Sequence, residues 1–389
     1  MTRSWTRATV VAATVSLLLA GCGAAGDAGA SDGGVPTAKI GSVLTMTGFP
    51  AVFGQEQKAG IELAVEQINK EGKAKLDFSA SEDTGEANAT ALNAYRKVAA
   101  DKPVVIFGPI IGTQVLAMRS EIQRSQIPLI TTAATRSLTE GENRYVFRNF
   151  PHSGMSASAE AEFVFDQLKL TRPAILADNT AFGQGDAAVL RQGAKERGLS
   201  IVADEKVDPA AVDVTGQVSR ILRAKADVVF VQLLTGSPLA IAVKTLRSQG
   251  FTGAVIAAPG ITSPSTLKLL TDAEVNEVYS PGLALNAENA ATKSFIDAFK
   301  AKYNKDPDIY AAVMYDSAMA VGQAVAAGNT TAESVGQALR TTQYSGITGT
   351  LRADKEGNLA HVVSILQFDD HKKASTKQTI DVKFEPSNG

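Results

Sequence analysis

The chain has 389 residues, a length that suits two domains of ordinary size. Its 38 Lys and Arg residues balance 40 Asp and Glu residues, so it has no surplus of positive charge with which to bind a nucleic acid. One cysteine and three histidines exclude an intrachain disulfide framework and leave too few ligands for a metal site rich in either residue. We therefore expect a two-domain α/β protein with no metal, no cofactor and no nucleic-acid partner.

The first residues have the features of a bacterial export signal. Arg3 and Arg7 give a positive start, and residues 8–20 form an uncharged, mostly apolar run that is too short to cross a bilayer comfortably. The run ends in Leu19-Ala20-Gly21-Cys22, which resembles the lipobox of lipoproteins, where the cysteine is lipid-modified and becomes the first mature residue. Residues 1–21 are therefore predicted to be a lipoprotein signal peptide, and an ordinary signal peptide with a stray cysteine is the alternative.

The segment that follows predicts a tether. Residues 22–36 are rich in Gly, Ala, Ser and Asp and contain nothing that could pack a core. No later segment is long and apolar enough to span a membrane. The expected product is a folded body held at the extracytoplasmic face of the cell membrane by a lipid on Cys22.

From residue 38 onward, short apolar runs alternate with amphipathic ones. Such alternation is typical of parallel sheets whose strands are joined by right-handed helical crossovers. We expect strands at residues 39–44, 76–80, 104–107, 128–131, 174–177, 201–203, 228–233 and 254–258. Helices are expected at residues 54–70, 87–100, 113–126, 156–170, 183–197, 214–224 and 239–250.

The pattern changes towards the C-terminus. Residues 287–340 contain three helical segments, in which Phe295, Phe299 and Tyr303 are spaced by four and should share one buried helix face. A glycine-rich turn region follows, then a strand at residues 362–368, and the tail after it is polar.

A short motif that occurs once in each half of the chain indicates a cleft. Phe53-Gly54-Gln55 opens the first helix of one half, and Phe182-Gly183-Gln184 occupies the same position in the other half. Ligands of open α/β sheets bind at the carboxyl ends of the strands, where both phenylalanines are expected. Two such ends facing each other would form a small-molecule cleft flanked by Phe53 and Phe182.

Two turns in the first half have the small residues and free backbone groups that a bound carboxylate needs. Gly112 and Thr113 start a helix soon after a strand, so their N–H groups point towards the strand ends. The next strand ends in Ala133-Ala134-Thr135, where small side chains let a ligand approach the backbone and Thr135 offers a hydroxyl. Each turn alone could be an ordinary tight turn, but two consecutive ones beside Phe53 favour a site.

Other motifs favour ordinary structure over chemistry. Gly183-x-Gly185-x-x-Ala188 mimics a dinucleotide fingerprint, but residues 178–182 separate it from the preceding strand, so packing glycines at a helix start are the better interpretation. His152 follows a proline in an expected linker and is interpreted as a surface histidine. The sequence has no Walker loop, metalloprotease helix motif or nucleophile elbow.

Taken in order along the chain, these segments resemble the type I periplasmic solute-binding proteins of the leucine/isoleucine/valine-binding group, which serve ABC importers. The resemblance covers nearly all of the chain after the tether. It rests on residues 40–60, Gly108-Pro109, Ala133-Ala134-Thr135, Asp178 with Phe182-Gly183, and Tyr310-Ala311 with Tyr315-Asp316.

The resemblance implies an α/β fold of two Rossmann-like lobes with parallel sheets, joined by a hinge of three crossing strands. It places lobe 1 at residues 37–151 and 281–360, and lobe 2 at residues 152–280 and 361–389. The lobes would close on a ligand by hinge motion, and the transporter would read the closed form.

The resemblance also implies a set of ligand contacts. The family grips an amino acid with a Ser or its backbone after the Gly-Pro loop, with the Ala-x-Thr loop, and with an acidic residue of lobe 2 that meets the ammonium. Gly112 stands where the Ser is usual, and Ala133 and Thr135 match the second loop. Gly260 falls where amino-acid binders have the acidic residue. Because a buried ammonium without a carboxylate partner is costly, a small carboxylic acid or an amide fits the retained groups as well.

The implied function is that of a binding protein without catalysis. It would capture a branched-chain or hydrophobic amino acid, or a related small carboxylate or amide, and deliver it to an ABC permease and its ATPase. Asp178, Asp204 or another acid of lobe 2 is the alternative partner for an ammonium. A ligand-sensing lipoprotein is an alternative function. An exported α/β enzyme is another, although the sequence has no histidine, acid or metal cluster at the expected strand ends.

The lipobox yields a direct test. Cys22→Ser removes the thiol that would carry the lipid, so the variant should move to the soluble fraction or keep its signal peptide uncleaved. Membrane fractionation with metabolic fatty-acid labelling measures both outcomes. A processed, lipidated form of the variant in the membrane fraction would contradict the prediction.

Overall fold

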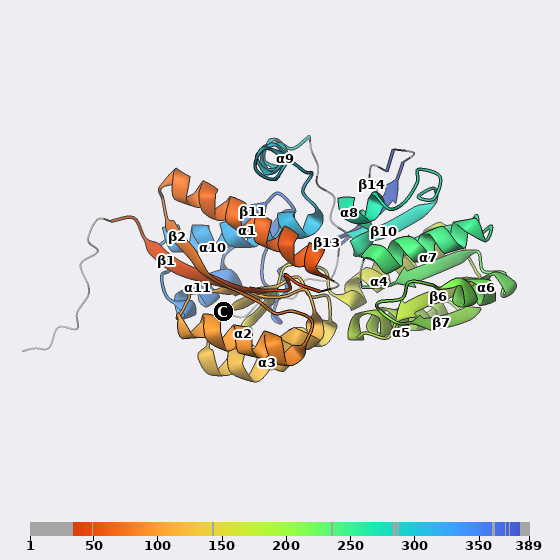
Figure 1. Ribbon diagram of the computed structural model, residues 1–389, viewed down its shortest axis with the longest axis horizontal. Helices are drawn as coiled ribbons and strands as arrows, with labels where there is room; N and C mark the ends of the chain where they lie inside the picture. The colour runs from red at the N-terminus through yellow and green to blue at the C-terminus, as the bar shows by residue number, and fades with distance from the viewer. Residues whose placement is uncertain are drawn as a thin grey trace, which may run out of the picture. The chain divides into compact units, whose positions relative to one another are not determined.

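The computed structural model describes residues 34–381, except 49, 142–143, 235, 283–284, 286–287, 360–361, 370 and 373. The predicted signal peptide, Cys22 and most of the predicted tether therefore lie outside the described residues. Two main sheets form the described chain, and helices pack against each of them (Figure 1). We call each sheet with its helices a lobe.

The first lobe has a five-stranded sheet in the order β2-β1-β3-β4-β5, and every strand pair in it is parallel. Its strands are β1 (Thr37–Leu44), β2 (Lys75–Asp83), β3 (Ile106–Phe107), β4 (Leu129–Thr131) and β5 (Val146–Arg148). The helices that connect them are α1 (Ala51–Glu71), α2 (Asn88–Ala100) and α3 (Gly112–Ser125), with a 3-10 turn at Arg136–Leu138.

The second lobe has a seven-stranded sheet in the order β14-β13-β10-β9-β8-β6-β7. Its strands are β6 (Pro173–Asp178), β7 (Ala203–Val207), β8 (Val228–Gln232), β9 (Ala254–Ala257), β10 (Val278–Gly282), β13 (Val362–Phe368) and β14 (Ala374–Asp381). The strands from β6 to β10 pair in parallel, whereas β13 and β14 are antiparallel to their neighbours. Its helices are α4 (Ser153–Ala161), a π-helical turn at Glu162–Gln167, α5 (Ala181–Glu196), α6 (Thr215–Arg223), α7 (Gly236–Ser248), a 3-10 turn at Pro259–Thr262, and α8 (Pro264–Leu267).

The segment after β10 returns to the first lobe. It forms α9 (Ala290–Tyr303), α10 (Ile309–Ala326), α11 (Ala332–Thr341) and the hairpin of β11 (Tyr344–Gly346) and β12 (Gly349–Leu351). The chain thus passes between the lobes after β5, after β10 and after β12. The predicted lobe boundaries stay predictions, and β10 continues beyond residue 280 to Gly282, which pairs with β13.

The predicted α/β class with parallel sheets is confirmed, and the differences are local. No strand was predicted in the polar tail, but Ala374–Asp381 pairs with β13 as the edge strand β14. A strand at a sheet edge needs few apolar side chains, so its sequence lacks the signal of a buried strand. β7 begins later than expected, at Ala203, and also lies at an edge of its sheet.

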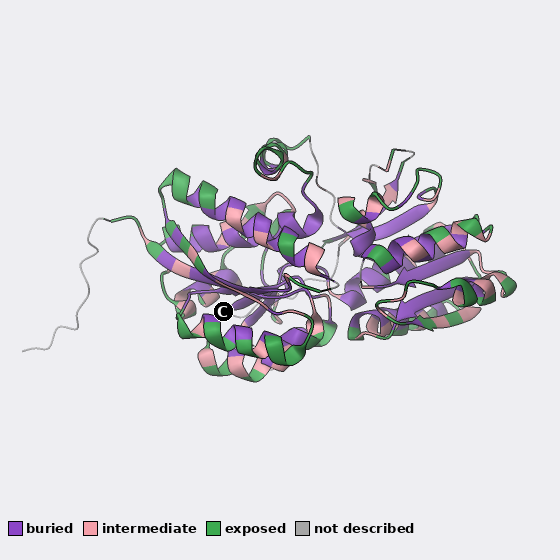
Figure 2. Cartoon of the chain, in the orientation of Figure 1, coloured by how far each residue is buried: buried purple, intermediate pink, exposed green. Residues whose placement is uncertain are grey.

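The inner strands of both sheets are buried on their two faces, as the purple strands in Figure 2 show, whereas the edge strands β2, β7 and β14 are partly exposed. In β1, Ile40 and Leu44 belong to the apolar cluster on the side of α1 and α10, whereas Val43 belongs to the cluster on the side of α2 and α3. The predicted aromatic face of α9 is confirmed, because Phe295 and Phe299 are buried and their ring centroids are 5.8 Å apart. Continuous apolar strands follow from this double coverage.

The packing of α1 against α10 depends on a close backbone approach at Gly60. A Cβ atom added to Gly60 would lie 2.0 Å from the carbonyl oxygen of Ala311 in α10. No side chain fits there, so the two helices could accept one only by moving apart.

Gly60→Ala should therefore lower the free energy of unfolding by about 1–3 kcal/mol, since overpacking forces the backbone to shift. Gly216→Ala in α6 is the matched control, because its added Cβ would have only Arg220 Nη1 within 4 Å, at 3.6 Å. The free energy of unfolding of this control should lie within about 1 kcal/mol of the parent value or above it, because alanine stabilises a helix more than glycine does. Urea denaturation measures both, and equal effects would refute the close approach.

Candidate ligand-binding site

A cavity of about 280 Å³ lies where loops from both lobes meet. The first lobe contributes the β3–α3 loop with the start of α3 and the segment after β4. The second lobe contributes the β6–α5 loop with the start of α5 and Leu234, two residues after the end of β8. The lining residues are Ile110, Ile111, Gly112, Thr113, Ala134, Thr135, Asn179, Thr180, Ala181, Phe182 and Leu234. Carboxyl ends of strands in both sheets thus meet at one pocket, the usual place for a ligand in open α/β sheets.

The wall from the first lobe presents the N-terminus of α3. Ile111 precedes the helix, and no side chain caps it. The first N–H groups of a helix have no partner within the helix, so those of Gly112 and Thr113 are available at the cavity. A Cβ atom on Gly112 would lie 2.1 Å from Thr135 Oγ1, so only glycine lets the helix start sit against that hydroxyl. Together these groups form a seat for a carboxylate.

The Thr135 loop is held from behind by a buried arginine. The Arg148 side chain, at the end of β5, has no exposed surface. Its Nη1 donates to the carbonyl oxygen of Thr135 at 2.6 Å, and its Nε and Nη2 donate to Asn358 Oδ1 at 3.0 and 2.6 Å. Burial lowers the pKa of Arg148 to about 9, which still leaves it charged at neutral pH.

The wall from the second lobe depends on Asp178, at the end of β6. Its Oδ1 accepts the backbone N–H of Thr180 at 3.0 Å, and its Oδ2 accepts the backbone N–H of Leu234 at 2.6 Å. Thr180 in turn caps α5 by accepting the N–H of Gly183. Asp178 is fully buried, and burial raises its pKa. Its carboxyl therefore joins the two loops that line the pocket and is already occupied.

The cavity lining carries no charged side chain. Its polar side chains are those of Thr113, Thr135, Asn179 and Thr180, and the rest of the lining is small or apolar. This arrangement can bind a small, largely apolar solute through a carboxylate, but it offers no acid–base pair for catalysis.

Five of the predicted site residues meet at this cavity, namely Gly112, Thr113, Ala134, Thr135 and Phe182. Asn179, Thr180, Ala181 and Leu234 also line the cavity and were not predicted. The Asp178-x-Thr180 pattern before a helix was a usable signal for the first two, because an Asx turn followed by a threonine N-cap places both residues at a strand end. Leu234 depends on the register between β6 and β8, which no local pattern reveals.

Phe53, Ala133 and Gly260 lie outside the lining of this cavity. The Phe53 ring has no exposed surface and packs against Tyr310 at a centroid distance of 4.8 Å, whereas we expected it to flank a cleft. Ala133 is buried in the core of the first lobe. Gly260 is buried next to Phe53, since its added Cβ would lie 3.4 Å from Phe53 Cζ. Their roles as ligand contacts stay predictions.

Gly183 and His152, which we interpreted as a packing glycine and a surface histidine, both have structural roles. Gly183 does pack at a helix start, because an added Cβ would lie 2.5 Å from Asp178 Oδ1. His152, in contrast, is not an ordinary surface histidine. Its Nδ1 caps α4 by accepting the N–H of Met155 at 3.2 Å, and burial lowers its pKa to about 3, so it is neutral at physiological pH.

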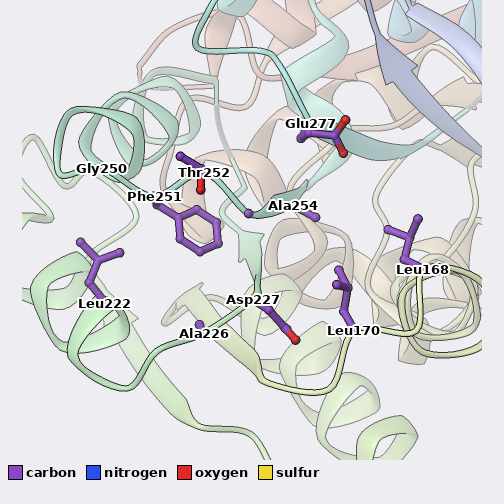
Figure 3. Close-up of a pocket in the computed structure, with 11 residues that line it drawn as sticks. Leu168, Leu170, Leu222, Ala226, Asp227, Gly250, Phe251, Thr252, Ala254 and Glu277 are labelled. Atoms are coloured by element: carbon purple, nitrogen blue, oxygen red, sulfur yellow. The ribbon is translucent and has the colours of Figure 1, made fainter.

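A larger groove of about 610 Å³ lies at the other end of the second sheet, before the start of β8, β9 and β10 (Figure 3). Its two acidic side chains are already engaged. Asp227 accepts the N–H groups of Thr171 and Arg172, and Glu277 accepts the hydroxyl of Tyr279 at 2.7 Å. The groove thus offers a ligand few free polar groups, and the smaller cavity at the carboxyl ends is the better candidate site.

The described residues contain neither a metal-binding cluster nor a helix that could span a membrane. No group of three or more His, Cys, Asp or Glu side chains in that part of the chain is placed to hold a metal ion. Within the same residues, no helix combines the length and hydrophobicity that a membrane crossing requires.

Comparison with known proteins agrees with this architecture. A curated relative, the leucine-, isoleucine-, valine-, threonine- and alanine-binding protein of Pseudomonas aeruginosa, is 25% identical over 87% of this chain and 91% of its own. The branched-chain amino acid transporter substrate binding protein of Streptococcus pneumoniae, solved with isoleucine, has a TM-score of 0.80 at 22% identity, covering 89% of this chain and 99% of that one. A solute binding protein of an R. palustris ABC transporter, solved with benzoate, has a TM-score of 0.78 at 17% identity, covering 91% and 98%.

A family model described as periplasmic binding protein matches residues 37–374, which include both sheets up to the start of β14. The curated relatives and the solved structures point to the same group within that family. This chain therefore belongs to the periplasmic binding proteins, in the type I group of the leucine/isoleucine/valine-binding proteins.

Proposed function

We propose that the protein is the substrate-binding lipoprotein of an ABC importer, anchored through Cys22 at the extracytoplasmic face of the cell membrane. It captures a small solute in the cavity between its lobes and delivers it to the permease and its ATPase. The observation that carries this proposal is the cavity itself, in which strand ends of both sheets converge on an uncharged lining. Homologues that bind small solutes support it.

We infer that the solute is a small carboxylate without an α-ammonium group. The N–H groups of Gly112 and Thr113 and the Thr135 hydroxyl serve the carboxylate. The two acids named as alternative partners for an ammonium are engaged elsewhere, because Asp178 is bonded to the pocket loops and Asp204 pairs with Arg191 at 2.5 Å. Gly260 supplies no charge. The benzoate bound by one relative is a ligand of this class, whereas isoleucine bound by another represents the amino-acid alternative.

Calorimetry with benzoate, short branched carboxylic acids and the amino acids leucine, isoleucine and valine tests this assignment. Acids without an ammonium should bind, and the amino acids should bind weakly, because their ammonium would lose water without gaining a carboxylate. Tight binding of a branched-chain amino acid that requires its ammonium would contradict the ligand class. Binding of none of these solutes, with binding of a neutral amide instead, would move the assignment to amides.

Gly260→Glu should shift the preference towards amino acids, because it adds the missing negative charge. The added Cβ would lie 3.2 Å from Leu239 Cδ1 and 3.4 Å from Phe53 Cζ, so the variant also strains its neighbours. Gly260→Ala is the matched control for that strain, since it adds the Cβ without the charge. Isoleucine affinity that rises in neither variant would show that position 260 does not face the ligand.

The two phenylalanines should behave differently, since only Phe182 lines the cavity. Phe182→Ala should weaken binding of the tightest acid by roughly 1–3 kcal/mol. Phe53→Ala should instead lower the free energy of unfolding by about 3–5 kcal/mol, because it leaves a void against Tyr310. Denaturation of the ligand-free variants and calorimetry separate the effects, and a Phe53→Ala protein of unchanged stability would refute the burial of this ring.

A further inference from the structure

A hydrogen bond between the lobes lies outside the cavity. Ser263, which precedes α8 in the second lobe, donates from its Oγ to Asp308 Oδ2 in the first lobe at 3.4 Å. Both residues are buried, with 1% and 3% of their surfaces exposed. Asp308 is also the N-cap of α10, since its Oδ1 accepts the N–H of Ala311 at 2.9 Å. The contact can exist only while the lobes are closed against each other at this point.

A second buried carboxyl lies beside Asp308. Glu56 of α1 is 6% exposed, and one of its oxygens pairs with Lys305. Its other oxygen, Oε2, is buried and has no hydrogen-bond partner. Such an orphaned acceptor is costly, unless a proton on a neighbouring group reaches it.

The charges around Asp308 oppose its ionisation. Burial raises the pKa of Asp308 to about 8, with a further contribution from the charge of Glu56, and Lys305 only partly offsets these effects. Tyr310 on α10 also faces Asp308 and is neutral, because burial raises its pKa. Tyr303 of α9 lies near Glu56 and is neutral for the same reason. The side chains that the second lobe brings to this point, Ser263 and Ser265, do not titrate.

We propose that the Ser263–Asp308 contact is a proton-linked latch, in which the closed lobes hold a proton on the Asp308–Glu56 pair that the open lobes release. Opening removes Ser263 and its lobe from Asp308 and lets water reach the carboxyl. The pKa of Asp308 then falls towards its usual value of 3.8, because burial is the main cause that raised it. Closure therefore takes up a proton, which lowers the negative charge that the buried Asp308 and Glu56 carboxyls would otherwise hold close to each other.

The sign of the pH effect follows from this difference. The closed form has the higher pKa, so its advantage is present at low pH and is lost as the pH rises through about 8. Between pH 6 and pH 9 the ratio of closed to open molecules should fall by up to about a hundredfold. The latch requires no particular ligand, so its failure would leave the proposed transport function untouched.

Distance measurement between two spin labels tests the latch without any ligand. Asn93 on α2 and Lys195 on α5 are exposed and lie in different lobes. Cysteines at these two positions can be labelled in a Cys22→Ser background, because Cys22 is the only native cysteine. Double electron–electron resonance of the full chain at pH 6 and pH 9 then gives the closed fraction. A closed fraction that falls with rising pH supports the latch, and an unchanged fraction overturns it.

Three variants assign the effect to these residues. Asp308→Asn keeps the helix cap and mimics the protonated acid, so it should stay closed at both pH values. Ser263→Ala should lower the closed fraction at both pH values, and no change would overturn the contact as a latch. Asp316→Asn is the matched control, because this buried acid bonds to Ile347 and Thr348 within the first lobe, and it should keep the parent pH response. A pH response that persists in Asp308→Asn would also overturn the proposal.

Discussion

The constraint on which the architecture depends is that each parallel sheet must be covered on both faces. In the first lobe, α2 and α3 cover one face, but α1 alone cannot cover the other. The chain therefore returns from β10 to lay α10 beside α1, where Gly60 lets the helix backbones approach. That return, and the later departure to β13, create the connections between the lobes. A chain that crosses between two lobes more than once is thus a consequence of completing one hydrophobic core.

The cavity inherits its chemistry from the same topology. Parallel strands direct their carboxyl ends, and the N-termini of the following helices, to one edge of each sheet. Where the two edges meet, the pocket is lined by N–H groups of α3 and by the capped start of α5. The Asp178 carboxylate accepts hydrogen bonds from the loops that form the wall and is not available to a ligand. In the function that we propose, the backbone would therefore supply anion recognition, and the side chains of the lining would determine the size and polarity of the solute.

Local periodicity accounts for what the sequence could reveal. The helix at α1 was predictable from the spacing of Ile61, Val65 and Ile68. Four residues of the cavity lining followed from small residues at strand ends, and Phe182 followed from the repeated Phe-Gly-Gln motif. Features that depend on residues far away in the sequence were not predictable from local patterns. The burial of Phe53 requires Tyr310, which comes much later in the chain. β14 forms because β13 offers it an edge, and the polar residues of β14 carry no signal of their own.

The buried guanidinium of Arg148 has a consequence for how the binding surface can change over evolution. Its hydrogen bonds link the Thr135 carbonyl to Asn358. One side of the proposed site is therefore fixed to a segment that lies just before the last crossing between the lobes. An insertion or deletion in the Thr135 loop would break these hydrogen bonds and leave the buried guanidinium without one of its partners. New solute preferences should therefore arise by exchange of side chains on a fixed backbone template, since the buried Asp178 ties the loops of the second lobe in a similar way.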